Sequence, residues 1–156
     1  MFMGFAQIIF ITNQLNVQIN DDNPNVSFGQ GEFSALVVDE TGLGLSGTGN
    51  FAGAFQANVG ADGGVVAYAL EINSLDSGLR DVATGAVIEL HLVGGTIQGW
   101  VDGDPAVVAF TAAVDGSGDL TLTQLRALQH PDTNDNDEPL AIAGGAIQLV
   151  ALATDG

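Results

Sequence analysis

Residues 86–137 read AVIELHLVGGTIQGWVDGDPAVVAFTAAVDGSGDLTLTQLRALQHPDTNDND, and this stretch decides the fold. Apolar and polar residues alternate over 86–92, which is the period-two pattern of a half-buried strand. The pair Gly94-Gly95 then forms a two-residue loop, the length that favours a primed hairpin turn. Similar segments and Gly/Asp-rich turns follow as far as residue 122. The stretch therefore predicts an antiparallel meander with strands at 86–92, 97–101, 107–114 and 120–122.

The rest of the chain adds further short strands and little else. Alternation or β-prone composition predicts strands at 15–19, 33–38, 51–57, 65–72 and 146–153. Residues 123–129 fit one helical turn capped by Thr123 and ended by Pro131. Residues 74–85 are expected to form a loop in which Arg80 pairs with a neighbouring acid. This pattern predicts an all-β fold, an Ig-like antiparallel β-sandwich with at most one short helical turn.

The charge of the chain narrows the classes of partner. It has 19 Asp and Glu residues against 2 Lys and Arg, a net charge of −17, while 46% of its residues are hydrophobic. So few basic residues disfavour nucleic acid and anionic membrane surfaces as partners. Crowded carboxylates destabilise a compact chain unless cations neutralise them, and calcium accepts clustered carboxylates. An acidic surface that serves solubility alone is the alternative.

Other compositional features exclude several kinds of site. The chain has no cysteine, so disulfides, thiol redox chemistry and thiolate zinc sites are excluded. No apolar run reaches the ~20 residues of a membrane helix, so no membrane insertion is expected.

Several ordered segments resemble a known family. The run LTLTQLRALQHPD at 120–132, the acidic stretch after it and AIQLVALATDG at 146–156 are similar to the repeat domain of giant RTX adhesins. VVDETGLG at 37–44 fits the same pattern. These bacterial surface proteins are exported by type I secretion. The resemblance covers roughly residues 20–156, and it implies a single β-sandwich repeat over 21–156 of a secreted, cell-surface stalk involved in adhesion and biofilm formation.

The resemblance also implies partners and a role. The repeat would be a calcium-stabilised extender that spaces a distal adhesive domain from the cell and is not an enzyme. Its neighbours would be adjacent repeats of the same chain, and host or biofilm ligands would bind other domains. Residues 1–20 would be the tail of a preceding repeat or a strand that completes this domain's own sheet. A calcium-dependent carbohydrate- or protein-binding module is the alternative function.

Two groups of oxygen-rich side chains are candidate calcium ligands. Alternating Asp and Asn residues in one loop can converge on a single ion, although the spacing is not that of an EF-hand. This first group comprises Asp132, Asn134, Asp135, Asn136, Asp137 and Glu138. The second group lies before Pro24 and after the predicted strand 33–38, and comprises Asp21, Asp22, Asp39 and Glu40.

Other motifs favour structural roles. Residues 42–49, GLGLSGTG, contain a formal G-x-G-x-x-G, but no helical pattern follows as a dinucleotide site would require. His91 and His130 lack a third ligand at zinc spacing. The pairs Asp102/Asp104 and Asp115/Asp119 are predicted to bond their own turns. Trp100, on the same strand face as Gln98, is the aromatic residue that an exposed binding face would use.

Overall fold

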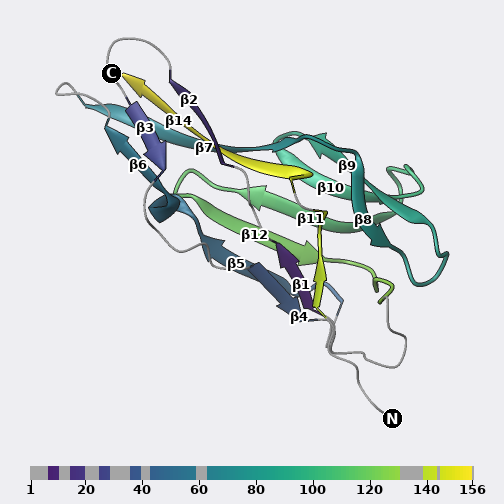
Figure 1. Cartoon of the computed structure of the whole chain (residues 1–156). Helices are drawn as coiled ribbons and strands as arrows, with labels where there is room; N and C mark the ends of the chain where they lie inside the picture. Colours follow the sequence, from purple (N-terminus) through teal and green to yellow (C-terminus); the bar gives the residue numbers. More distant parts are fainter. Residues whose placement is uncertain are drawn as a thin grey trace.

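The computed structural model describes residues 7–10, 15–19, 25–28, 36–39, 43–58, 63–130, 139–143 and 145–155. An antiparallel six-stranded sheet forms the centre of the molecule (Figure 1). Its strands, in spatial order, are β5 (Ser46–Asn50), β12 (Asp119–Gln124), β11 (Val108–Val114), β10 (Thr96–Val101), β9 (Val87–Val93) and β8 (Asp76–Arg80). The predicted meander is thus confirmed as β9 to β12, joined by tight turns.

Three smaller sheets accompany it. The largest has the order β2 (Leu15–Ile19), β14 (Ile147–Asp155), β7 (Gly64–Ile72), in which β14 is parallel to β2 and antiparallel to β7. A second has the order β13 (Pro139–Ala141), β1 (Gln7–Phe10), β4 (Leu36–Asp39). The third pairs β3 (Asn25–Phe28) with β6 (Phe55–Asn58). Both strands that precede residue 21 therefore pair with strands from the rest of the chain.

One hydrophobic core joins the six-stranded sheet to the sheet of β14 and β7. Inward-facing residues of the meander, among them Phe110 and Leu122, lie in the same buried cluster as Leu149 of β14 and Leu70 of β7. Alternate residues of β9, β10 and β12 are buried in this core, as the period-two pattern requires. Burial of such apolar area is the main stabilising contribution, at about 25 cal/mol per Å².

Three glycines are required by this arrangement. Gly94 and Gly95 have φ values of 57° and 84°, the two positive values that a type I′ hairpin turn needs. In β10, a Cβ at Gly99 would lie 2.5 Å from Cε1 of Phe110 and 2.8 Å from Cγ2 of Ile88. The absence of a side chain at Gly99 therefore lets the Phe110 ring pack directly on the strand.

The all-β, mainly antiparallel class predicted from the sequence is confirmed, and the finer Ig-like assignment stays a prediction. The helical turn predicted for residues 123–129 is wrong. Thr123 and Gln124 continue β12, and Leu128 forms a bridge with Asp81. The amides of Leu125 and Arg126 both donate to the Ala109 carbonyl, so contacts with β11 replace the local helical bonds. The one helical element among the described residues is a 3-10 turn, Ala52–Ala54, within the segment expected to be a strand at 51–57.

The predicted loop at 74–85 also differs from the structure, because residues 76–80 form β8 on the edge of the large sheet. The Ser77 hydroxyl donates to the Ile88 carbonyl at 2.6 Å and accepts from the Leu79 amide, which fixes this polar strand against β9. Among the residues that the structure describes, Arg80 has no acidic partner, contrary to expectation. It is exposed, and its Nη1 donates to the Gly85 carbonyl at 3.0 Å.

Candidate functional site

The structure does not test the predicted calcium ligands. Asp39 is the last residue of β4, opposite Gln7 of β1, and only its backbone is described. The remaining candidate ligands lie outside the described residues: Asp21, Asp22, Glu40, Asp132, Asn134, Asp135, Asn136, Asp137 and Glu138. Within the described ranges, no group of three or more His, Cys, Asp or Glu side chains is placed to hold a metal ion.

Of the four aspartates predicted to bond the backbone of their own turns, Asp104 and Asp115 do so. Asp104 Oδ1 accepts from the Ala106 amide at 2.9 Å. Asp115 Oδ1 accepts from the amides of Ser117 and Asp119, at 2.8 and 3.0 Å. Asp119 instead accepts a 2.6 Å bond from the Asn50 side chain and so ties β12 to β5. These carboxylates stabilise the ends of the strands.

A stacked aromatic pair occupies the outer face of β9 and β10. The rings of His91 and Trp100 lie 3.9 Å apart at an interplanar angle of 16°. Trp100 Nε1 donates to Gln98 Oε1 at 2.8 Å, and Glu89 Oε2 lies 3.5 Å from His91 Nε2. Because the indole is half-buried, stacked on one side and bonded at its nitrogen, these contacts hold Trp100 in place on the sheet.

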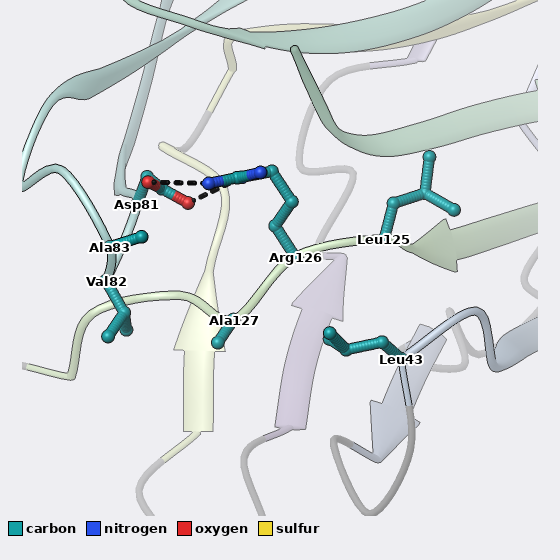
Figure 2. A pocket seen from close by; sticks show the side chains of 7 residues that line it. All are labelled: Leu43, Asp81, Val82, Ala83, Leu125, Arg126 and Ala127. Carbon is teal, nitrogen blue, oxygen red and sulfur yellow. Dashed lines mark hydrogen bonds and ion pairs between the residues drawn. The ribbon is translucent and has the colours of Figure 1, made fainter.

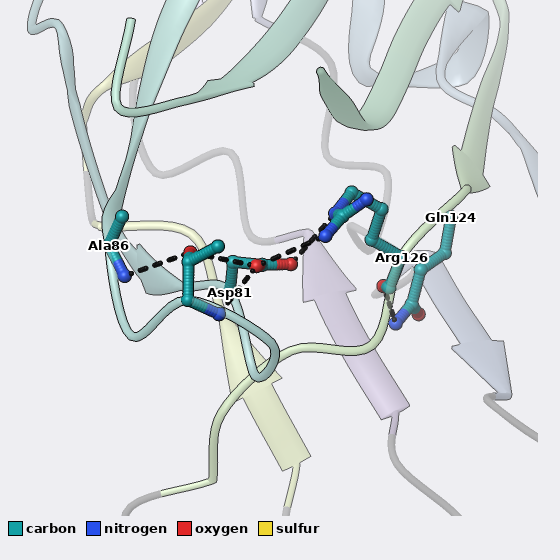
Figure 3. A network of polar contacts seen from close by, with 5 residues as sticks. Asp81, Ala86, Gln124 and Arg126 are labelled. Carbon is teal, nitrogen blue, oxygen red and sulfur yellow. Dashed lines mark hydrogen bonds and ion pairs between the residues drawn. The ribbon is translucent and has the colours of Figure 1, made fainter. Parts of the chain in front are cut away.

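A buried carboxylate, Asp81, lies just after β8. Its side chain is 1% exposed, and its two oxygens accept from Nε and Nη2 of Arg126 at 2.8 and 3.2 Å (Figure 3). The amide and hydroxyl of Thr84 also donate to it, at 3.0 and 2.9 Å. A buried carboxylate needs such donors, since an unpaired buried charge costs several kcal/mol.

These contacts set the protonation of the pair. The hydrogen bond from Arg126 lowers the pKa of Asp81 below its usual value, with further lowering by Thr84, and together they outweigh the opposing effect of burial. In turn, the hydrogen bond to Asp81 raises the pKa of Arg126. Both groups therefore stay charged at neutral pH, and the pair joins the β8–β9 connection to the segment that follows β12.

A shallow pocket of about 260 Å³ lies beside this pair (Figure 2). Apart from Asp81 and Arg126, its lining is apolar: Leu43, Val82, Ala83, Leu125 and Ala127. Leu43 and Val82 are more than half exposed, at 61% and 57%. The polar groups of the pocket are thus already bonded to each other, and what it offers a ligand is mainly apolar contact.

Sequence reasoning missed this ion pair, although a signal for it existed. Ser77 and Leu79 face inward from β8 while Asp76, Gly78 and Arg80 face outward. Continuing that alternation places Asp81 inward and Arg80 outward. Since the sequence has only two arginines, a buried Asp81 would have pointed to Arg126.

The comparison with known proteins places the chain in a family. Residues 35–156 match the model of the domain of unknown function DUF5801. The chain belongs to the DUF5801 family. No curated protein and no solved structure matches the sequence. The matched range of this DUF5801 domain includes the whole large sheet, the Asp81–Arg126 pair and the predicted acidic loop 132–138. In the part of the chain that the structure describes, no helix is long and apolar enough to cross a membrane.

Proposed function

We propose that this DUF5801 domain is a calcium-stabilised spacer repeat of a secreted, RTX-type bacterial adhesin. The arrangement of its first and last strands carries the proposal. The start of β1 and the end of β14 lie at opposite ends of the molecule (Figure 1). A domain that the chain enters at one end and leaves at the other extends a stalk when it is joined to adjacent repeats. That stalk would hold an adhesive domain away from the cell surface.

The unbalanced charge supports the role of calcium. Of the two arginines in the sequence, Arg126 is engaged by Asp81 and Arg80 donates to a backbone carbonyl. Nearly all of the 19 acidic residues therefore lack a cationic partner from lysine or arginine in the same chain. Their repulsion opposes compaction, and a bound divalent cation removes that repulsion where carboxylates crowd together.

We assign the calcium ligands to the two groups named from the sequence. The loop with Asp132, Asn134, Asp135, Asn136, Asp137 and Glu138 is the main site, because it supplies hard oxygen ligands within seven residues. Asp21, Asp22, Asp39 and Glu40 form the second. In this proposal the shared core of the two larger sheets corresponds to an Ig-like sandwich, the type of domain that repeats in extracellular stalks.

Isothermal titration calorimetry tests the calcium assignment directly. Calcium is added to the apo domain and to the variant Asp135→Asn/Asp137→Asn. The matched control is Asp102→Asn/Asp104→Asn, which removes the same two charges at the same spacing in a described turn. We expect saturable binding in the parent and the control, and at least tenfold weaker binding in the first variant. Equal affinity in all three proteins would contradict the assignment.

A binding module is the second candidate, and the stacked pair on the outer face of β9 and β10 is the observation that favours it. Trp100 is held there beside His91 and Gln98, side chains that can bond sugar hydroxyl groups. Glycan-array binding that disappears in Trp100→Ala and persists in Phe110→Leu, a core substitution, would support this function. Absence of glycan binding together with strong calcium binding would favour the spacer.

A further inference from the structure

The N-terminal strands run parallel to the C-terminal strands over two successive ladders. In the first ladder, β1 pairs with β13, from Gln7↔Pro139 to Ile9↔Ala141. In the second, β2 pairs with β14, from Leu15↔Leu149 to Ile19↔Ala153. The other eight strand pairs of the described residues are antiparallel. The two parallel pairs are thus the ones that connect the N-terminal strands, β1 and β2, to the C-terminal strands, β13 and β14.

The direction of these strands decides how they respond to tension. In a parallel pair, the start of one strand and the end of the other lie at opposite ends of the ladder. Tension applied at the start of β2 and at the end of β14 therefore slides the strands past each other, and all their hydrogen bonds bear the load together. In an antiparallel pair loaded at a strand start and a strand end, both lie at the same end of the ladder. Such a pair opens one bond at a time.

β14 is firmly anchored, so β2 is the strand that must slide. Nine residues of β14 pair with β7, from Ile147↔Ile72 to Asp155↔Gly64. The side chains of Leu149, Ala151 and Ala153 are buried in the shared core, none more than 1% exposed. β2, in contrast, is an edge strand whose partner within its sheet is β14.

We propose that the β2–β14 ladder is a mechanical clamp, preceded by the β1–β13 ladder, that resists tension carried along the chain through this domain. The clamp consists of backbone hydrogen bonds, so it does not depend on calcium at the acidic loops. The clamp gives the proposed spacer a specific load-bearing element. The evidence for the clamp is the direction and register of the paired strands.

Single-molecule force spectroscopy tests the clamp by changing the direction of pulling. The domain, in millimolar calcium, is pulled once through handles at its N- and C-termini. It is pulled again between the C-terminus and a cysteine at Val65→Cys, which is 67% exposed at the start of β7 in a chain without other cysteines. Because Gly64 lies opposite Asp155, the second geometry opens the β7–β14 ladder one bond at a time.

We expect the terminal geometry to need roughly twofold more force than the second geometry, since its hydrogen bonds bear the load together. Equal or lower force would overturn the proposal.

Proline variants then locate the clamp. Successive residues of an edge strand point their amides to opposite sides, so one of Asn16→Pro and Val17→Pro removes a bond to β14. The matched controls are Gly47→Pro and Thr48→Pro in β5, another edge strand with five paired residues. We expect one β2 variant to lower the terminal-geometry force and both β5 variants to leave it unchanged, even where they lower thermal stability. A force that falls equally in the β2 and β5 variants would contradict the clamp.

Discussion

Arg126 holds both carboxylate oxygens of the buried Asp81, a residue 45 positions earlier in the chain. This pair fastens the loop after β8 to the segment after β12. It also uses one of the two arginines in a chain of net charge −17. Arg126 neutralises only this one buried carboxylate. The charges of the exposed carboxylates must therefore be screened by cations from solution.

Removing Arg126 is expected to destabilise the domain more than removing the other arginine. Arg126→Met leaves the Asp81 carboxylate buried without its main donor, and an uncompensated buried charge is costly. Arg80→Met, the matched control, removes an exposed arginine that donates to a backbone carbonyl. Thermal melts should show a fall of several degrees for Arg126→Met and a small change for Arg80→Met. Equal melting temperatures in the two variants would show that the pair contributes little.

The pair should also give part of the acid sensitivity of the domain. The pKa of Asp81 is lowered in the folded state, so the unfolded chain binds its proton first as the pH falls. The stability that Asp81 contributes is therefore present above its usual pKa of 3.8 and is lost as the pH falls through the lower folded value. Melting temperatures of the parent and of Asp81→Asn, measured from pH 7 to pH 2, should converge at the acid end. A difference that stays constant over this range would contradict the lowered pKa.

The sequence predicted the parts of the fold that depend on local signals. In β9 to β12 the alternation is regular and the turns carry Gly and Asp, so each strand can be recognised without its partners. β8 was missed because D-S-G-L-R is polar and flexible by composition, and its strand conformation depends on pairing with β9. The helical turn at 123–129 was wrong for a related reason, since the Ala109 carbonyl takes the amides that a helix would have used.

The site was less accessible to sequence reasoning than the fold. An ion pair between Asp81 and Arg126 depends on two strand ends meeting in space, and the sequence shows only the inward alternation that would bury Asp81. The predicted calcium ligands follow from composition and from the family resemblance. Apart from the backbone of Asp39, they lie outside the described residues and remain predictions.

The close packing at Gly99 gives a second test of the core. Gly99→Ala would place a methyl group 2.5 Å from the Phe110 ring, and such overpacking costs about 1–3 kcal/mol. Gly116→Ala is the control, because a Cβ there meets nothing within 4 Å. Urea unfolding should show a lower midpoint for Gly99→Ala and an unchanged or slightly higher midpoint for Gly116→Ala, where reduced chain entropy favours folding. Equal midpoints would mean that the strand shifts to accommodate the methyl group at no cost.

The most direct test of the calcium-stabilised spacer is a thermal melt of the domain in EDTA, in millimolar calcium and in millimolar magnesium. At an ion concentration about 100-fold above the dissociation constant, binding to the folded state stabilises it by about 2.7 kcal/mol. For a domain of this size, that corresponds to a rise in melting temperature of roughly 5–10 °C. We predict such a rise in calcium, a much smaller one in magnesium, and loss of the calcium effect in Asp135→Asn/Asp137→Asn. Identical melting in all three buffers would contradict the account and would leave the acidity as a means of solubility alone.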